Sequence, residues 1–261
     1  MGKKSKSKTG GVSLRSPEEI ANLKISGKIT ALALKKAIEE ARVGMSLIEL
    51  DKIAEEEILK LGGQSSFKTV PGYFWTTCLT INDEVVHGTP RDIKLNDGDV
   101  LNIDLGAIYK GWHTDAAWTI VVGKSSPDKD KFLKIGEQTL WNAIEQAKVG
   151  NQIGDISATI AQGVETGGYS VVRSLSGHGV GRKPHEEPTI PGFGKFKTGM
   201  VLKSGMSLAI EVIYLQGKDG LYQKEDNWTL ASMDGSLGGL FEMSVIIQNQ
   251  KADVLTDWRN V

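Results

Sequence analysis

The sequence predicts an α+β fold made of two similar halves, and three observations support this. Two helical segments are followed by short strands, and the same order of elements then occurs a second time. Residues 37–44 read AIEEARVG and residues 143–150 read AIEQAKVG, so six of eight positions agree at an offset of 106. The 31 glycines among 261 residues are typical of tight turns and close backbone approaches. Two such halves are expected to pack about a pseudo-two-fold axis, with a cleft at their junction.

The first half begins with two helices. Residues 16–19 (SPEE) combine an N-cap serine, a proline at the first helical position and a glutamate at the third. This capping box predicts a helix that ends before Gly44. Residues 46–49 (SLIE) form a second capping box, and the glycine pair at 62–63 ends the second predicted helix.

The segments that follow are predicted to be strands and then the second pair of helices. From residue 67 to residue 122 the chain is β-branched or aromatic and is interrupted by turn residues. Helices are expected at 127–148 and at about 155–166, with strands and glycine-rich loops after them. One hairpin, centred between Tyr109 and Lys110, is predicted to set Asp104 directly opposite Asp115.

Four carboxylates interrupt segments that otherwise read as buried strands: Asp104, Asp115, Glu211 and Glu242. An unpaired buried carboxylate costs several kcal/mol, and like charges opposite each other destabilise a sheet. A salt bridge or an outward-facing position explains any one of them. The four together favour a shared positive ion.

The four histidines of the chain also lie in distinctive segments. His87 follows residues 82–86 (NDEVV), and His113 lies beside Asp115. His178 and His185 share one glycine-rich segment, where the glycines exclude a regular helix and let the backbone approach a ligand closely. The clustering of these imidazoles near the carboxylates favours a metal site over chance placement.

Composition and charge exclude other classes of protein. Apolar residues make up 39% and charged residues 24% of the chain, and no apolar run approaches the roughly 18 residues of a membrane span. A single cysteine, Cys78, indicates a reducing compartment, so a cytoplasmic location is expected. Residues 1–16 carry five basic and no acidic side chains, whereas the remainder holds 26 basic and 32 acidic ones. We expect residues 1–13 to form a basic, disordered arm, and residues 14–261 to form a single catalytic domain.

The order of these residues resembles the methionine aminopeptidase/prolidase family of metallopeptidases, and type I methionine aminopeptidases in particular. The resemblance rests on the five-residue order Asp104, Asp115, His178, Glu211 and Glu242 and on three motifs, which are residues 82–90 (NDEVVHGTP), 177–182 (GHGVGR) and 185–188 (HEEP). It extends from about residue 16 to about residue 250. It implies the pita-bread fold, in which helices cover one face of a curved, mostly antiparallel sheet.

The resemblance also implies two divalent metal ions, with cobalt, manganese, iron and zinc all permitted. Asp115 and Glu242 would bridge the two ions. Asp104 would complete the shell of one ion, and His178 with Glu211 that of the other. Four carboxylates and one imidazole suit transition metals better than calcium.

By the same resemblance, a hydroxide bound to both metals attacks the first peptide bond of the substrate. Glu211 would accept a proton near that water, His185 would hydrogen-bond the scissile carbonyl oxygen, and His87 would contact the scissile nitrogen. The residues implied around the first side chain of the substrate are aromatic or contain sulfur: Tyr73, Cys78 and Trp228.

This chain departs from the family pattern at four positions: Val212 in place of proline, Leu240 in place of glutamine, Met243 in place of histidine, and Pro184 where an aromatic residue is common. None of these changes removes an expected ligand. They are expected to alter the surroundings of the ligands, and so the rate and the metal preference.

The implied function is removal of the initiator methionine from nascent polypeptides whose second residue is small. Two alternatives stay open, which are cleavage before proline, as in prolidases, and a non-catalytic peptide- or ribosome-binding role on the same fold. The expected partners are nascent N-termini and, through the basic arm, the ribosome or its RNA. We expect a monomer that binds neither DNA nor membranes.

Overall fold

The structure, a computed structural model, describes residues 11–261. Most of the basic arm predicted for residues 1–13 therefore lies outside the described residues. Val12 is buried in the main hydrophobic core, so the folded part already includes a residue that the sequence assigned to the arm.

Four helices form where the sequence predicts them: α1 (Pro17–Glu40), α2 (Leu47–Lys60), α3 (Pro127–Gln146) and α4 (Ile153–Thr166). Both predicted capping boxes are present, because Ser16 and Ser46 each exchange hydrogen bonds with the glutamate three residues later. α1 ends at Glu40, before Gly44 as predicted, because Ala41 adopts an extended conformation. None of the helices in residues 11–261 is long and apolar enough to cross a bilayer.

The described residues form one ten-stranded sheet and one three-stranded sheet. The central order of the large sheet is β1-β4-β5-β12-β9-β7-β8, with β2 beside β4, β6 beside β9 and β13 beside β12. Its strands are β1 (Gln64–Ser65), β2 (Thr77–Ile81), β4 (Val100–Tyr109), β5 (Trp112–Val121), β6 (Ser170–Val171), β7 (Ser176–Gly179), β8 (Glu186–Pro191), β9 (Ser207–Leu215), β12 (Gly238–Ile246) and β13 (Asp253–Val254). The small sheet contains β3 (Glu84–Val86), β10 (Leu221–Gln223) and β11 (Leu230–Ser232). Every pairing between these strands is antiparallel.

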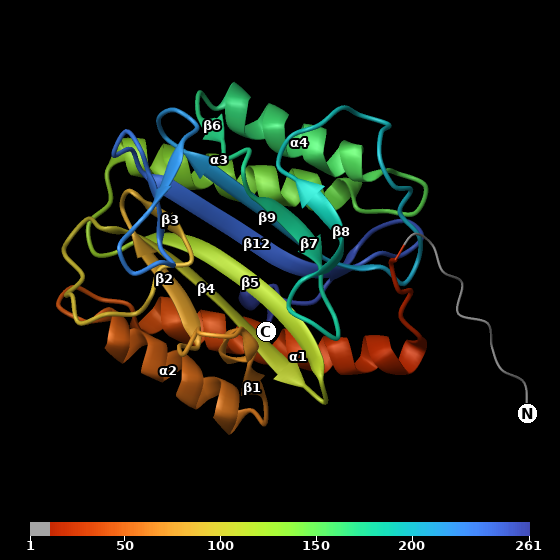
Figure 1. Ribbon diagram of the computed structural model, residues 1–261, viewed down its shortest axis with the longest axis horizontal. Helices are drawn as coiled ribbons and strands as arrows, with labels where there is room; N and C mark the ends of the chain where they lie inside the picture. Colours follow the sequence, from red (N-terminus) through yellow and green to blue (C-terminus); the bar gives the residue numbers. More distant parts are fainter. Residues whose placement is uncertain (1–10) are drawn as a thin grey trace, which may run out of the picture.

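The two predicted halves meet at the centre of the large sheet. β4 and β5 come from the first half, β9 and β12 come from the second, and the halves join where β5 pairs with β12 (Figure 1). The repeated segments 37–44 and 143–150 begin in the last turn of α1 and of α3, which are equivalent places in the two halves. This arrangement agrees with the duplication that the sequence indicates.

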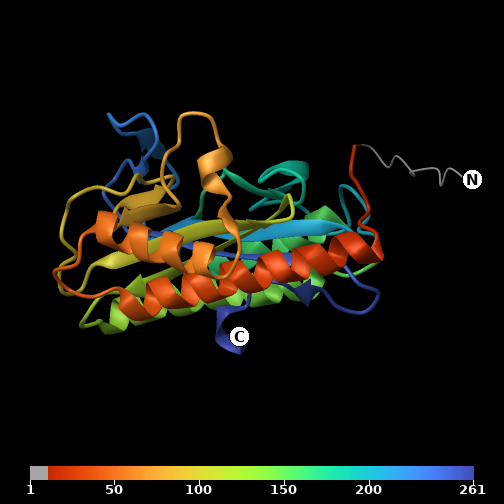
Figure 2. The ribbon, with the colours of Figure 1, turned by 90° about the horizontal axis from the view of Figure 1, so that it is seen from below.

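The helices cover one face of the large sheet, as expected for the pita-bread fold. Figure 2 shows the helices on one side of the strands, and the small sheet and several loops on the other. Alternate strand residues such as Ile103, Ile210 and Phe241 enter the main core beneath the helices. The residues between them therefore point to the face that the helices leave free.

The predicted register of one hairpin is wrong by two residues. The turn consists of Lys110 and Gly111, both with positive φ, which matches a two-residue type I′ turn. Tyr109 therefore pairs with Trp112, and Asp104 lies opposite Ala117 instead of opposite Asp115. The two aspartates still share a face, because Asp115 and Ala117 are two residues apart on one strand.

Substitution of Gly136 by alanine tests how closely α3 packs on the sheet. A β-carbon at this position would lie 2.5 Å from the ring of Phe241 and 2.5 Å from the hydroxyl oxygen of Tyr214. We expect Gly136→Ala to lower the free energy of unfolding by about 1–3 kcal/mol through overpacking, although alanine favours helix by about 1 kcal/mol. Urea unfolding measures this, with Gln138→Ala on the exposed side of α3 as the control. A Gly136→Ala variant as stable as the wild type would contradict the packing described.

Candidate active site

A single row of residues crosses five strands of the large sheet on the face that the helices leave free. From β2 to β9 the paired residues are Cys78, Asp104, Ala117, Glu242 and Glu211. Asp115 lies two residues from Ala117 on β5, and His178 on β7 pairs with Ala209, two residues from Glu211. Strand alternation therefore puts all five predicted ligands on one face. The carboxylates that face each other directly are Glu211 and Glu242.

The ligand atoms of these residues converge in two overlapping groups. One group contains His178, Glu211 and Glu242, the other contains Asp104, Asp115 and Glu242, and within each group the ligand atoms lie within 4.8 Å of one another. Nε2 of His178 lies 3.7 Å from Oε1 of Glu242. Glu242 belongs to both groups, so its carboxylate lies between two places where a cation fits.

Three buried oxygens in this site have no hydrogen-bond partner within residues 11–261. They are Oδ1 of Asp104, Oδ1 of Asp115 and Oε1 of Glu242. In the same part of the chain, no lysine or arginine pairs with any of the four carboxylates. Because buried polar groups are nearly always satisfied, these oxygens fit ligation of divalent cations, and the residues present suit a metal.

Burial raises the pKa values of all four carboxyls. Burial is the largest cause for each, and it raises the pKa of Asp115 to about 7 and, with repulsion from Asp115, the pKa of Glu211 to about 8. The pKa values of Asp104 and Glu242 are raised well above their ordinary range, with further repulsion from the neighbouring carboxylates. The metal-free site therefore holds protons near neutral pH, and a divalent cation has to displace them.

His178 is oriented for ligation. Its Nδ1 lies 3.0 Å from the carbonyl oxygen of Gly179, which accepts a hydrogen bond from the Nδ1–H tautomer. This leaves the lone pair of Nε2 directed toward Glu242. Burial lowers the pKa of His178 to about 3, so the ring is neutral at pH 7, as a metal ligand must be.

Beside the site, the hydroxyl group of Ser244 on β12 forms hydrogen bonds across the junction between the two halves. β5 and β12 pair through Ala117 with Glu242 and through Ala116 with Met243. Next to these pairs, Ser244 Oγ accepts from the backbone N–H of Asp115 and donates to its carbonyl oxygen, both at 2.8 Å. The backbone of Asp115 is therefore fixed from the opposite half of the molecule.

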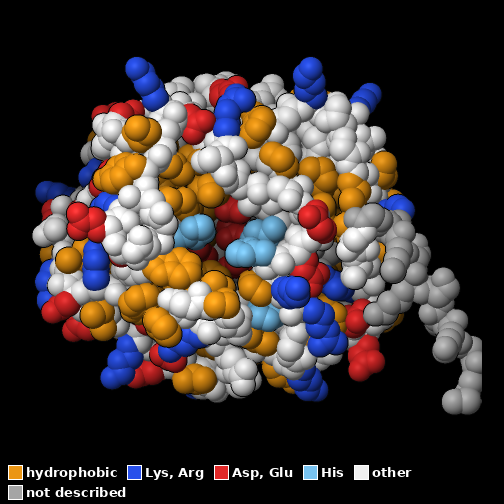
Figure 3. All heavy atoms as spheres, in the orientation of Figure 1, with side chains coloured by type: hydrophobic (Ala, Val, Ile, Leu, Met, Phe, Trp, Pro, Cys, Tyr) orange, Lys and Arg blue, Asp and Glu red, His pale blue; other side chains and the backbone are white. Residues whose placement is uncertain are grey.

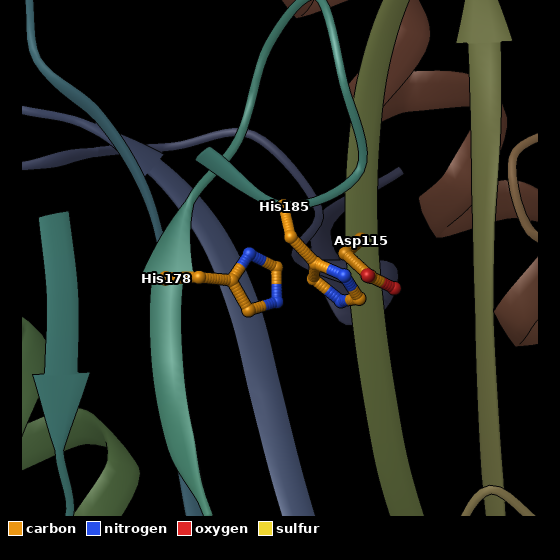
Figure 4. A group of neighbouring side chains, drawn as sticks. All are labelled: Asp115, His178 and His185. Atoms are coloured by element: carbon orange, nitrogen blue, oxygen red, sulfur yellow. The ribbon is translucent and has the colours of Figure 1, made fainter. Parts of the chain in front are cut away.

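His87 and His185 lie at the mouth of a cavity of about 900 Å³ above the carboxylates. Figure 3 shows imidazoles on both sides of acidic side chains at the base of the hollow. The ring centroid of His185 is 4.3 Å from that of His178, and Figure 4 shows His185 reaching from its loop toward His178 and Asp115. Desolvation lowers the pKa of both rim histidines, and nearby His185 lowers that of His87 further. Both rings are therefore neutral at pH 7.

An aromatic pocket opens into the same cavity next to Asp104. The ring centroid of Tyr73 lies 5.0 Å from that of Trp228 and 6.4 Å from that of Phe67, in edge-to-face contacts. Cys78 belongs to the same cluster and pairs with Asp104 across the sheet. Burial raises the pKa values of Cys78 and Tyr73, so both side chains are neutral. The three residues predicted for the substrate pocket are thus brought together beside the carboxylates.

The remaining residues singled out in the sequence divide between the cavity and the core. Leu240 lines the cavity, but Val212 and Met243 lie in the core beneath the helices, because they occupy the other face of their strands. Pro184 precedes His185 in its loop. His113 is buried away from the cavity, with Nδ1 2.8 Å from the hydroxyl oxygen of Ser66.

Sequence reasoning missed several residues that line the cavity: Arg15, Phe67, Val86, Leu175 and Ile213. Strand alternation relative to Glu211 would have identified Ile213, two residues further along β9. Arg15 lies far away in the sequence and offered no such signal.

Comparison with known proteins agrees with this geometry. Residues 21–248 match the profile of metallopeptidase family M24. Methionine aminopeptidases from Clostridium perfringens and Bacillus subtilis are 40% and 39% identical over 243 and 242 residues, in each case 93% of this chain and 98% of that protein. The chain therefore belongs to metallopeptidase family M24, whose members use divalent metal ions.

Solved structures give the same result for the fold. The crystal structure of methionine aminopeptidase from Thermotoga maritima matches with a TM-score of 0.92 and 37% identity, over 94% of this chain and 99% of that chain. Prolidase from Pyrococcus furiosus matches with a TM-score of 0.76 and 26% identity, over 93% of this chain but only 65% of that chain. The fold is thus the pita-bread fold that methionine aminopeptidases and prolidases share.

The raised carboxyl pKa values predict how the stability of the metal-free protein depends on pH. Unfolded carboxyls lose their protons near pH 4, whereas Asp115 and Glu211 in the folded protein keep theirs until about pH 7 and 8. Their stabilising contribution is complete below about pH 4 and is lost as pH rises through these values. Between about pH 7 and 8.5, where imidazoles are mostly neutral, we expect the free energy of unfolding to fall by roughly 1 kcal/mol per pH unit for each proton retained.

Urea unfolding in EDTA at pH 7 and 8.5 measures this difference. Glu211→Gln should reduce the pH dependence, and saturating Mn²⁺ should remove most of it, because bound metal displaces the protons. Equal stability of the metal-free wild type at the two pH values would contradict the raised carboxyl pKa values.

Proposed function

We propose that this chain is a methionine aminopeptidase that removes the initiator methionine from nascent polypeptides with a small second residue. The observation that carries the proposal is the aromatic and sulfur-containing pocket directly beside a cluster of four carboxylates and one imidazole. Relatives with 40% and 39% identity over nearly their full length carry that name. The pocket suits a thioether side chain, because sulfur makes favourable contacts with aromatic rings.

The proposed centre holds two divalent ions, with cobalt, manganese, iron and zinc all compatible with the ligands. Asp104, Asp115 and Glu242 would hold one ion, and His178, Glu211 and Glu242 the other, with Asp115 as a second bridge. The two overlapping ligand groups, which share Glu242, support this division of the ligands, and a ligand atom of Asp115 also lies within 4.8 Å of one of His178. Bound ions of this kind supply Lewis acidity and an activated water molecule.

The surrounding side chains would orient the peptide and handle protons. Glu211, one of the carboxylates around the proposed ions, would accept a proton from the attacking water and pass it on. His185 would donate a hydrogen bond to the scissile carbonyl oxygen as negative charge develops there. His87, across the mouth of the cavity, would contact the scissile nitrogen and assist its departure. A neutral imidazole serves both roles, since it offers one donor and one acceptor nitrogen.

The proposed substrates are the N-termini of nascent chains in a reducing, cytoplasmic compartment, which suits the free thiol of Cys78. The prolidase alternative is less well supported, because the match to a prolidase is weaker and leaves a third of that chain uncovered. A purely binding role has no support from the site, since none of the five candidate ligands is replaced. Contact of the basic arm, residues 1–13, with the ribosome or its RNA, and a monomeric state, remain part of the proposal.

Release of methionine from Met-Ala-Ser is the direct test of this function. We expect metal-dependent release with at least one of the four candidate ions, and Asp115→Ala should abolish it because both ions lose a ligand. Liquid chromatography of the products measures the rate, with EDTA-treated wild type as the control. No release with any of these ions, or faster turnover of Xaa-Pro peptides, would contradict the proposal.

Trp228→Ala tests the proposed pocket. Removing the indole should raise KM for Met-Ala-Ser roughly tenfold, with a smaller change in kcat, because aromatic contacts of about 1–1.5 kcal/mol to the methionine side chain are lost. Steady-state kinetics measures both constants. Phe74→Ala is the matched control, because Phe74 belongs to the neighbouring loop but is 75% exposed and should leave KM unchanged. An equal KM for the wild type and Trp228→Ala would exclude Trp228 from the pocket.

A further inference from the structure

The imidazole of His185 depends on its loop for its position. Within residues 11–261 its ring nitrogens make no hydrogen bond, and its neighbours are the ring of His178 and the carboxylate of Asp115. The side chain is also exposed to the cavity. The position of the His185 ring above the carboxylates is therefore set by the backbone conformation of residues 180–186.

One buried arginine from the start of the chain holds that backbone. The side chain of Arg15 is only 5% exposed, and its Nη2 contacts both the carboxylate of Glu186 and the carbonyl oxygen of Val180. Its Nε donates to Ser207 Oγ on β9 at 2.9 Å, and its backbone N–H donates to the carbonyl oxygen of Gly205 at 2.8 Å. The guanidinium therefore joins the loop of His185 to the large sheet.

Glu186, the residue after His185, closes the loop on itself. Its Oε1 accepts the backbone N–H groups of Arg182 at 2.6 Å and Lys183 at 3.1 Å, while its Oε2 contacts Arg15. Among the described residues, Arg15 is the only cationic side chain paired with this carboxylate. Charge-assisted hydrogen bonds of this kind are short and strong.

The far side of the loop is fixed as well. The guanidinium of Arg182 lies 3.9 Å from the ring centroid of Trp112 at the start of β5, and the backbone N–H of His113 donates to Gly181 at 2.7 Å. Gly181 has no side chain, and a β-carbon there would overlap the guanidinium of Arg15. The loop thus leaves just enough space for the arginine.

We propose that Arg15 is a positioning residue, which acts through Glu186 to hold His185 over the reacting carbonyl. This inference rests on the proposed function, because it assigns Arg15 a role in the step that His185 assists. Arg15 also links the segment ahead of α1 to the loop that carries His185, 170 residues further along the chain.

Kinetics of Arg15 variants give the first measurement. A displacement of about 1 Å can cost on the order of a hundredfold in rate, so we expect Arg15→Ala to lower kcat for Met-Ala-Ser by about ten- to a hundredfold, with little change in KM. Arg15→Lys should recover part of this loss, and Glu186→Gln should reproduce it without removing volume. Arg259→Ala is the control, because Arg259 pairs with Glu137 outside the cavity. Metal content, measured by mass spectrometry, should not change in any variant.

A double-mutant cycle separates positioning from a general structural effect. If Arg15 acts through His185, Arg15→Ala in the His185→Ala background should cause no further loss of kcat. The same fold-loss in both backgrounds would overturn the proposal. If Arg15→Ala does not fold, Arg15→Lys and Glu186→Gln complete the cycle.

Nuclear magnetic resonance gives a readout that needs no turnover. The chain has four histidines, so ¹⁵N-histidine labelling yields four assignable rings. Arg15→Ala should shift or broaden the ring signals of His185 and affect those of His87 less. Unchanged His185 signals would overturn the proposal. Loss of His185 order in a protein that never releases methionine would instead refute the proposed function and leave the positioning role in place.

Discussion

The burial of four carboxylates on one face of the large sheet is the constraint on which the rest of this structure depends. Glu211 and Glu242 are direct cross-strand partners, and Asp104 and Asp115 share the same face. Three of their oxygens lack a hydrogen-bond partner among residues 11–261, and no basic side chain there offsets the charge. In the absence of metal, the carboxyl groups of this cluster have to keep protons bound, as their raised pKa values indicate. Divalent cations satisfy the same oxygens, so the sheet is built to be completed by metal.

The duplicated fold explains how such an unfavourable cluster is assembled. Each half contributes a pair of long antiparallel strands, and the acids of both halves meet only where β5 lies beside β12. The helices and the core beneath them occupy the other face, and they hold the sheet in place while contributing nothing to the centre. The complete site therefore forms only at the junction, because each half supplies part of the candidate ligands.

The parts around the centre differ in how they are held. The five candidate ligands lie on strands, where backbone pairing limits their movement. His87, His185 and Trp228, which we propose to contact the peptide, lie on loops, where local contacts fix the side chains. For His185 those contacts include Arg15 and Glu186. This division places strongly interacting charges on the rigid sheet and the proposed substrate contacts on segments that can adjust.

The sequence alone was sufficient for the helices, the duplicated order of elements and the identity of the candidate ligands. Capping boxes are local, and a carboxylate in an apolar strand stands out without any structure. Only the tertiary structure decided that Glu211 faces Glu242 across β9 and β12, and that Asp104 lies opposite Ala117, because the latter register follows from a two-residue turn at Lys110 and Gly111. It also placed Met243 in the core and Leu240 in the cavity, since adjacent strand residues point to opposite faces and the outcome depends on where the helices pack. The contact between Arg15 and Glu186 joins segments 171 residues apart, and no local pattern encodes a contact of that range.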